Sequence, residues 1–245
     1  MFLDRFIPND LTQDSVATVF TFALSVAWLR LMDSLAARGA LSARTSRKVI
    51  HIGTGPLFVL CWLLFSPSST ARWLAALVPL AITTQFALVG LGWMRDDKAV
   101  KAMTRHGDPR EILRGPLFYG IVFVACTIAF WRSSPIGIVA LMILCGGDGL
   151  ADLVGRRWGR AKLPFNREKS WVGSAAMFAG GYLLAVGVTA LFEAVGMFAP
   201  PLTPHAGVAI AWIALGSTIV ESLPVRDVDN LLISGTAIVL GLLLL

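Results

Sequence analysis

The chain has 245 residues, of which 56% are hydrophobic and 15% are charged, and its formal net charge is +6. This composition excludes an ordinary soluble domain and indicates an integral membrane protein in a lipid bilayer. The positive charge lies in short loops beside apolar runs, where it reports membrane topology, so we do not expect nucleic acid as a partner. We expect residues 1–245 to form a single polytopic membrane domain, without a soluble domain.

The apolar runs predict an all-α fold with about eight transmembrane helices (seven or eight), because a helix needs roughly 20 apolar residues to cross a bilayer. In chain order, the runs are 15–37, 49–65, 73–93, 116–131, one that begins at 135, 171–196, 206–223 and 229–245. The first run is expected to be a span rather than a cleaved signal. Ser134 and Pro135 predict the start of the fifth helix. Three cysteines are expected to be core residues rather than disulfides or metal ligands, namely Cys61, Cys126 and Cys145.

Lysine and arginine are concentrated in the loops after the first, third, fifth and seventh runs, and the other loops are nearly bare. By the positive-inside rule, we expect the basic loops in the cytoplasm and both termini outside, in a cytoplasmic membrane of the bacterial type. This prediction includes Arg5, Arg105 and Arg226 in the charge pattern.

The segment 145–174 combines the residue types of a nucleotide-phosphate site. Asp148 and Asp152 end an apolar run, and their spacing puts them on one face of a helix. Carboxylates within membrane segments are costly and therefore indicate function. Mg²⁺ often takes one or two protein carboxylates together with phosphate and water, so we expect these two to hold Mg²⁺ as the cofactor. The alternatives are an acid pair neutralised by Arg156 or Lys162, and an ion relay in a transporter.

A basic loop follows the two carboxylates and ends where the sixth apolar run begins. Lysines offset phosphate charge, glycines permit close approach, and backbone N–H groups at a helix N-terminus bind anions. The expected phosphate contacts are Gly149, Gly155, Lys162, Lys169, Ser170, Gly173 and Ser174. The alternative interpretation is a positive loop followed by an ordinary serine cap.

Two further polar clusters are expected on the same side of the membrane and complete the site from residues 44–55 and 221–230. They are Arg47, Lys48 and His51 before the second run, and Glu221, Asp229 and Asn230 around the last loop. The first cluster is expected to bind phosphate, with His51 able to move a proton; the alternative is an interfacial anchor. Glu221 is expected to accept a hydrogen bond from a nucleotide or substrate hydroxyl, whereas the other two alternatively cap the last helix.

These motifs resemble the polyprenol kinase family, which includes phytol, farnesol and dolichol kinases that typically use CTP. The motifs are Arg47-Lys48-x-x-His51, Gly147-Asp148-Gly149-x-Ala151-Asp152-x-x-Gly155, Lys169-Ser170-x-x-Gly173-Ser174 and Glu221-Ser222-Leu223-Pro224 with Asp229-Asn230. They occur in the family's order over residues 44–240, and 111–119 (EILRGPLFY) is also similar. The short chain resembles the phytol kinase branch.

The resemblance implies transfer of the γ-phosphoryl group of CTP to a membrane-dissolved isoprenoid alcohol, such as phytol, geranylgeraniol, farnesol or a polyprenol. Asp148 and Asp152 then hold Mg²⁺, and His51 or Asp148 takes the alcohol proton. The central segment also resembles the CDP-diacylglycerol synthase group of cytidylyltransferases. The chain lacks that group's Pro-Gly-His-Gly-Gly motif with a following Asp-Arg, which favours the kinase. An ion-coupled transporter is a further alternative, and it predicts no nucleotide turnover.

Overall fold

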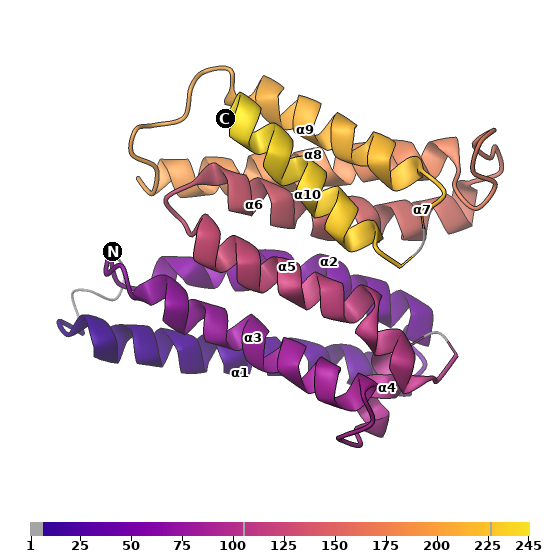
Figure 1. Ribbon diagram of the computed structural model, residues 1–245, viewed down its shortest axis with the longest axis horizontal. Coiled ribbons are helices and arrows are strands. Elements are labelled where there is room, and N and C mark those ends of the chain that lie inside the picture. Colours follow the sequence, from indigo (N-terminus) through magenta and orange to yellow (C-terminus); the bar gives the residue numbers. More distant parts are fainter. Residues whose placement is uncertain (1–6, 105, 226) are drawn as a thin grey trace. The chain divides into compact units, whose positions relative to one another are not determined.

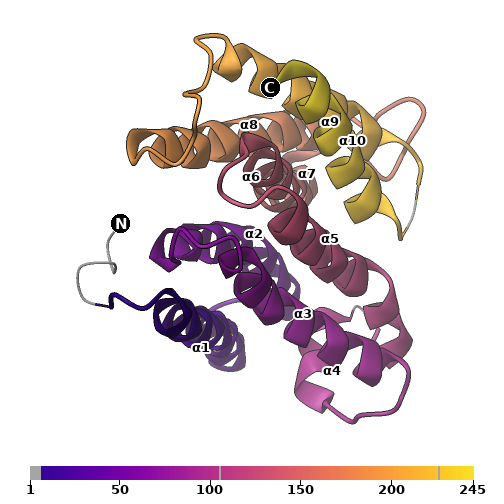
Figure 2. The same cartoon turned by 60° about the vertical axis from the view of Figure 1, so that its left-hand side comes forward.

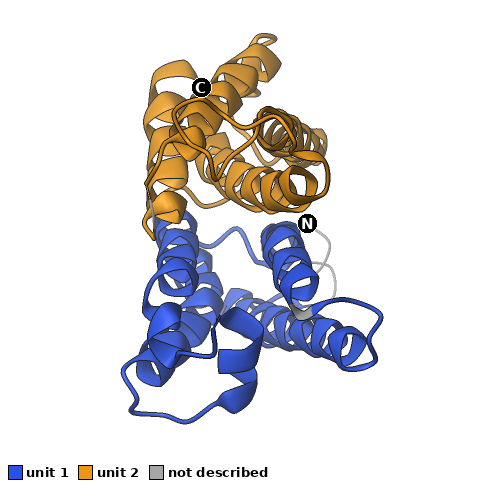
Figure 3. Ribbon diagram, turned by 90° about the vertical axis from the view of Figure 1, so that its right-hand side faces the viewer, with its two compact units in different colours: residues 1–129 blue, residues 130–245 orange. Residues whose placement is uncertain are grey.

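A computed structural model describes residues 7–104, 106–225 and 227–245, with the backbone alone at Ala43. Arg5, Arg105 and Arg226, which entered the topology prediction, lie outside the described residues. The chain divides into two compact units, Met1–Ala129 and Phe130–Leu245, shown in different colours in Figure 3. Each unit is considered by itself below.

The all-α membrane fold predicted from the sequence is confirmed. Within the described residues, six helical segments are long and apolar enough to cross a membrane, and two further apolar helices, Ala206–Ser222 and Asp229–Leu244, are shorter. These segments coincide with the eight predicted apolar runs. The described part of the chain has no strand, and its one isolated antiparallel bridge joins Lys162 to Ser170.

The first unit is built from four long helices and a short polar connection. Its elements are α1 (Asp10–Ala37), α2 (Ala43–Cys61), the 3₁₀ turn η1 (Trp62–Leu64), α3 (Ala71–Gly90), α4 (Asp97–Met103), the 3₁₀ turn η2 (Pro109–Leu113) and α5 (Gly115–Ala129). Helix α1 packs on α2 and α3, and α3 packs on α5 (Figure 2). Helix α4 contacts α2, so the polar connection after α3 lies beside the start of α2.

Helix α2 begins at Ala43, more than one and a half turns before the predicted Val49. The reason is a polar cap, which hydropathy does not detect: Ser42 Oγ accepts a hydrogen bond from the backbone N–H of Thr45 at 3.1 Å. The basic cluster at the start of the second run therefore lies inside the helix. Helix α1 also starts earlier than predicted, behind Asn9, whose side chain caps it.

The second unit is organised around one helical segment of 24 residues, Pro135–Trp158. Its elements, visible in Figure 1, are α6 (Pro135–Met142), the π-helical turn η3 (Ile143–Asp148), α7 (Gly149–Trp158), α8 (Trp171–Ala194), α9 (Ala206–Ser222) and α10 (Asp229–Leu244). In the most apolar stretch of the 24-residue segment, 78% of residues are buried, against 17–39% in the other five long segments. Ser134 caps its start as predicted, by accepting a hydrogen bond from Ile136 N at 3.4 Å.

Glycines set the distance between this central segment and α8. A Cβ atom on Gly146 would lie 2.8 Å from the backbone oxygen of Gly180, and one on Gly180 would lie 2.7 Å from the oxygen of Gly146. Farther along, a Cβ on Gly155 would lie 3.3 Å from Gly173 Cα. Small residues that let two backbones approach are typical of helix contacts in membranes. Gly155 and Gly173, both predicted to face phosphate, therefore also have a packing role.

All three cysteines are free and buried, as predicted for core residues. Cys61 is 5% exposed, and Cys126 and Cys145 are 0% exposed. They contribute apolar volume within the helices rather than a covalent link.

Candidate active site

The loop between α7 and α8 is folded against the end of α9. Leu163 N donates a hydrogen bond to Lys169 O at 3.1 Å, which closes the loop on itself. The buried side chain of Asn166 donates from Nδ2 to the backbone oxygen of Ser222 at 2.9 Å. The loop is thereby fixed to the last turn of α9. The sequence analysis did not single out Asn166, because nothing in its spacing distinguishes it from other loop residues.

This folding brings together four predicted site residues from four elements: the central segment, the loop after α7, α9 and α10. Lys169 Nζ donates a hydrogen bond to Glu221 Oε1 and forms an ion pair with it. Burial alone would lower the pKa of Lys169, but the negative charges of Glu221, Asp148 and Asp229 raise it above its ordinary value. The ammonium group of Lys169 is therefore held charged within a group of three carboxylates.

Glu221 has a structural partner as well as a predicted substrate role. Its side chain is 2% exposed, and its carboxylate pairs with Lys169 across 52 positions of sequence. The pairing positions the ammonium group at the end of α9. The predicted hydrogen bond to a nucleotide or substrate hydroxyl stays a prediction.

Asp148 ends a π-helical turn within the central segment. This turn, Ile143–Asp148, is buried throughout, and Asp148 itself is 7% exposed. Single π turns inside α-helices are frequent at functional sites, because the wider turn redirects the side chains that follow it. Asp152 follows one turn later on α7, so the two carboxylates share a face as the spacing predicts.

Asp152 pairs with the arginine one turn further along α7. Arg156 Nη2 lies 2.6 Å from Asp152 Oδ2, and Arg156 Nε donates to the backbone oxygen of Asp152 at 3.1 Å. The neutralisation of an acid by Arg156, weighed as an alternative to a metal, is thus present for this carboxylate.

The donor chemistry fits a metal that is only partly held by protein. Among the described residues, no three His, Cys, Asp or Glu side chains lie close enough to hold a metal ion by themselves. Asp148 and Asp152 supply hard carboxylate oxygens, which Mg²⁺ commonly combines with phosphate oxygens and water. A role for these two residues in binding Mg²⁺ stays a prediction.

The predicted phosphate contacts lie around the start of α8. Ser170 caps this helix, as expected from its position: its Oγ accepts a hydrogen bond from Gly173 N at 3.1 Å. Ser174 Oγ is buried and has no hydrogen-bond partner within the described residues. Lys162 is exposed at the isolated bridge, and Gly149 is buried in the first turn of α7. The cap occupies one N–H group of the predicted anion site, and Ser174 contributes an unused hydroxyl.

The interpretation of Asp229 and Asn230 as a helix cap is wrong. Val228 occupies the N-cap position and provides no capping side chain, and Asp229 is the first residue of α10. Asp229 Oδ1 accepts a hydrogen bond from Asn230 N at 3.1 Å. A carboxylate in a first turn is stabilised by the helix dipole, and this one also contributes to the negative charge around Lys169.

The predicted cluster of Arg47, Lys48 and His51 lies in the first unit, where its side chains contact two different elements. Arg47 Nη1 donates to Thr104 O at 3.2 Å, just after α4. The His51 ring lies against Tyr119 of α5, with centroids 4.5 Å apart, and Tyr119 Oη donates to His51 O at 2.9 Å. Lys48 lies on the same turn of α2. Arg47 and His51 therefore lie one turn apart on α2, and their side chains are held by different partners, Thr104 and Tyr119.

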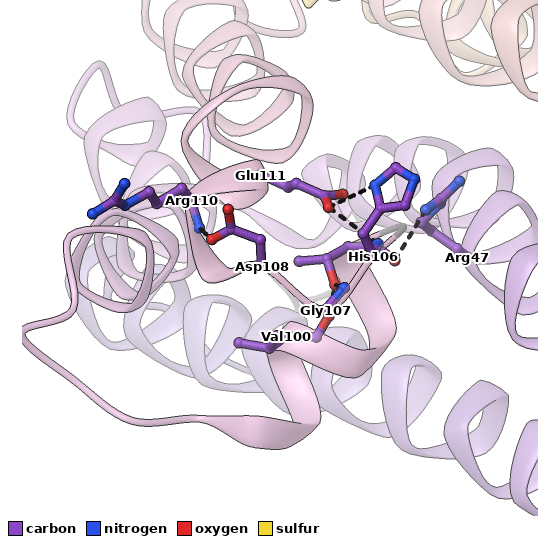
Figure 4. Close-up of polar contacts among 8 residues, drawn as sticks. Arg47, Val100, His106, Gly107, Asp108, Arg110 and Glu111 are labelled. Carbon is purple, nitrogen blue, oxygen red and sulfur yellow. Dashed lines mark hydrogen bonds and ion pairs between the residues drawn. The ribbon is translucent and has the colours of Figure 1, made fainter.

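The segment 111–119 supplies part of this support. Tyr119 holds the backbone at His51, and Glu111 Oε1 accepts a hydrogen bond from His106 N at 3.0 Å (Figure 4). The same carboxylate oxygen lies 3.0 Å from His106 Nδ1. The sequence alone provided no physical account of this segment, because its contacts join residues that hydropathy and spacing do not relate.

Comparison with known proteins gives a clear set of relatives. No protein-family model and no solved structure matches the chain. The chain is 45% identical over 221 residues to probable phytol kinase 1, chloroplastic, of Oryza sativa subsp. japonica, covering 89% of this chain and 70% of the relative. It is 43% identical over 226 residues to probable phytol kinase, chloroplastic, of Zea mays, covering 91% and 74%. It is 37% identical over 219 residues to phytol kinase 1, chloroplastic, of Arabidopsis thaliana, covering 89% and 72%.

Proposed function

The chain belongs to the phytol kinase family, and from this premise we propose that it transfers a phosphoryl group to the hydroxyl of phytol or a related isoprenoid alcohol. The observation that carries the proposal is identity of 37–45% over about nine-tenths of the chain to proteins with this name. The fold supports it, because an acceptor dissolved in the bilayer can approach between apolar helices. In this proposal, the polar cluster of Asp148, Lys169, Glu221 and Asp229 in the second unit would be the reaction site.

We further propose CTP as the phosphoryl donor and Mg²⁺ as the cofactor. Bound Mg²⁺ offsets the negative charge of the nucleotide phosphates, and Asp148 with Asp152 would hold it. Lys169, fixed by Glu221, would bind a phosphate oxygen, and Ser174 Oγ would donate a hydrogen bond to another. Phosphoryl transfer depends mainly on positioning and charge, which this arrangement supplies.

The acceptor hydroxyl also needs a group that takes its proton. We assign this role to Asp148, which lies in the charged cluster of the second unit. His51 of the first unit is the second candidate. Its ring is fixed against Tyr119, and an imidazole nitrogen can accept a proton.

We place the reaction on the membrane face that carries the basic loops. The helices indicate a multi-pass membrane protein. The similar proteins are named chloroplastic, and their names give no support to the predicted bacterial-type cytoplasmic membrane. In this proposal, both termini lie on the face opposite the basic loops.

The direct test is transfer of label from CTP to lipid. Purified protein in detergent is incubated with Mg²⁺, CTP labelled at the γ-phosphate, and phytol, geranylgeraniol, farnesol, a long polyprenol or diacylglycerol. We expect label in the organic phase, with phytol among the good acceptors. Absence of labelled lipid with every alcohol contradicts the kinase. CTP labelled at the α-phosphate, supplied with phosphatidic acid, then identifies a cytidylyltransferase by labelled lipid.

The roles of Asp148 are tested by Asp148→Asn, which preserves size and removes the negative charge. We expect transfer to fall by about 100-fold or more, the size of effect seen when one stabilising group is removed from an active site. Membrane insertion should be unchanged. Asp10→Asn, at an exposed carboxylate in the first turn of α1, is the matched control and should retain full activity. Normal turnover by Asp148→Asn would remove the metal and base roles.

A further inference from the structure

The first unit contains a pocket of about 580 Å³ between the start of α2 and the polar residues 97–104 and 106–107. Residues on its wall include Arg44, Arg47, Asp97, Lys101, Thr104 and His106. Of these residues, only Arg47 was expected from the sequence to contact phosphate. The volume lies in the range of pockets that hold small molecules or the polar part of larger ones.

The pocket carries an excess of positive charge. Arg44 and Arg47 come from the first two turns of α2, and Lys101 comes from the last turn of α4. Asp97 is the one carboxylate on the described wall. The N-terminus of α2 adds the partial positive charge of its helix dipole. Arg44, Arg47 and Lys101 thus bring two guanidinium groups and one ammonium group to one pocket wall, and such groups bind the oxygens of a phosphate group.

The wall of the pocket is held in place by its own hydrogen bonds. Arg47 Nη1 donates to Thr104 O at 3.2 Å, and Gly107 N donates to Thr104 Oγ1 at 3.1 Å. Gly107 has a φ of +81°, a conformation that favours glycine and turns the chain sharply. Glu111 also holds His106 in place, because its carboxylate contacts both the backbone N–H and the ring of His106 (Figure 4). The turn after α4 is therefore well defined, and it holds the side chain of Arg47 in place, which lowers the entropic cost of binding.

The pocket lies at the start of a candidate membrane span, Arg44–Leu64, where a lipid phosphate would be expected. Arg44 lies at the start of an apolar segment, and Lys101 lies on the polar helix α4, which follows the connection that carries Trp93. Trp93 is 79% exposed, and tryptophans at helix ends are typical of the membrane–water interface. Basic pockets among membrane helices at this depth commonly bind anionic head groups.

We propose that this pocket binds a phosphate group, carried either by an anionic phospholipid or by a soluble phosphate compound. The proposal goes beyond the kinase reaction, and binding is measured without turnover. Its failure and the failure of the proposed kinase activity are therefore separate results.

The test is hydrogen–deuterium exchange of the backbone in segment 97–107 in nanodiscs. Wild-type protein is compared in phosphatidylcholine, in phosphatidylcholine with phosphatidylglycerol, and in phosphatidylcholine with added inorganic pyrophosphate. At a ligand concentration ten times the dissociation constant, exchange through opening of the pocket should slow about tenfold. Slowing with phosphatidylglycerol alone identifies a lipid head group, and slowing with pyrophosphate alone identifies a soluble phosphate.

Two double variants with equal loss of charge show whether the pocket is responsible. Arg44→Gln with Lys101→Gln removes two wall cations and should abolish the slowing. Lys98→Gln with Arg110→Gln removes two exposed cations of the same polar region outside the wall, and it should retain the slowing. Thermal unfolding checks that both variants are folded. The proposal is overturned if neither phosphate source slows exchange in the wild type, or if both double variants respond alike.

Discussion

The ion pair between Lys169 and Glu221 joins a loop to the end of a membrane helix. The two side chains differ in exposure: that of Glu221 is 2% exposed and that of Lys169 is 31% exposed. A buried carboxylate that loses its partner is left with an uncompensated charge, which costs more than the intact pair gains. The partly exposed ammonium group keeps access to water. The two residues should therefore respond differently to removal of their partner.

We predict that Lys169→Met lowers the free energy of unfolding by about 3 kcal/mol, because it leaves the Glu221 carboxylate buried and unpaired. Glu221→Met should cost less, since the ammonium group can turn to solvent. The double variant should recover part of the loss of Lys169→Met. Denaturant unfolding in detergent of all four proteins gives the coupling energy. Additive losses in the double variant would contradict an energetic pairing.

The raised pKa of Lys169 also predicts a pH window. A lysine whose pKa is higher in the folded state contributes stability in full below its unfolded pKa, and this contribution is lost as the pH rises through the folded pKa. The ordinary value is 10.5. The difference in unfolding free energy between wild type and Lys169→Met should therefore be constant from about pH 7 to 9 and decrease above 10.5. A decrease that begins near neutral pH would rule out this assignment.

Hydropathy predicted the helices well and their ends less well. Crossing a bilayer requires a long apolar run, which is visible in any sequence. Caps are polar and lie outside such runs, so the true start of α2 at Ala43 was missed. The π turn at Ile143–Asp148 was also missed, because the same residues fit an α-helix and packing decides between the two.

The candidate site, like the helices, could be predicted from the sequence only in part. Residue types and motif order indicated Asp148, Lys169 and Glu221 as members of one polar site. The pairing of Lys169 with Glu221 was not predictable, since it joins positions 52 residues apart. The glycines show a second limit, because Gly155 and Gly173 fit both phosphate contact and helix packing until their neighbours are known.

The contact between the central segment and α8 gives a matched pair of glycine substitutions. We predict that Gly180→Ala costs about 1–3 kcal/mol, because its methyl group would lie 2.7 Å from the backbone oxygen of Gly146. Gly187→Ala on the same helix meets nothing within 4 Å. That variant should be as stable as wild type, or more stable by up to about 1 kcal/mol from helix propensity. Thermal unfolding in detergent compares them, and equal stability would refute the close packing.

At the scale of the whole molecule, each unit has a polar contact that joins helix ends beside its basic loops. In the first unit, Arg47 joins the start of α2 to the end of α4. In the second unit, Lys169 joins the loop before α8 to the end of α9. A kinase that uses a soluble nucleotide and a bilayer alcohol needs its charged groups at one membrane face, so these loops should share a side.

The side of each loop can be read by cysteine labelling, because the native cysteines are buried and should be silent toward a membrane-impermeant maleimide. Lys98→Cys and Arg167→Cys place an exposed thiol in basic loops, and Ser69→Cys and Thr203→Cys place one at the opposite helix ends. In intact cells, we expect labelling of the second pair at once, and of the first pair only after permeabilisation. The reverse pattern would invert the topology. If Lys98→Cys and Arg167→Cys label from different sides, the basic loops do not share a membrane face, and the predicted topology is wrong.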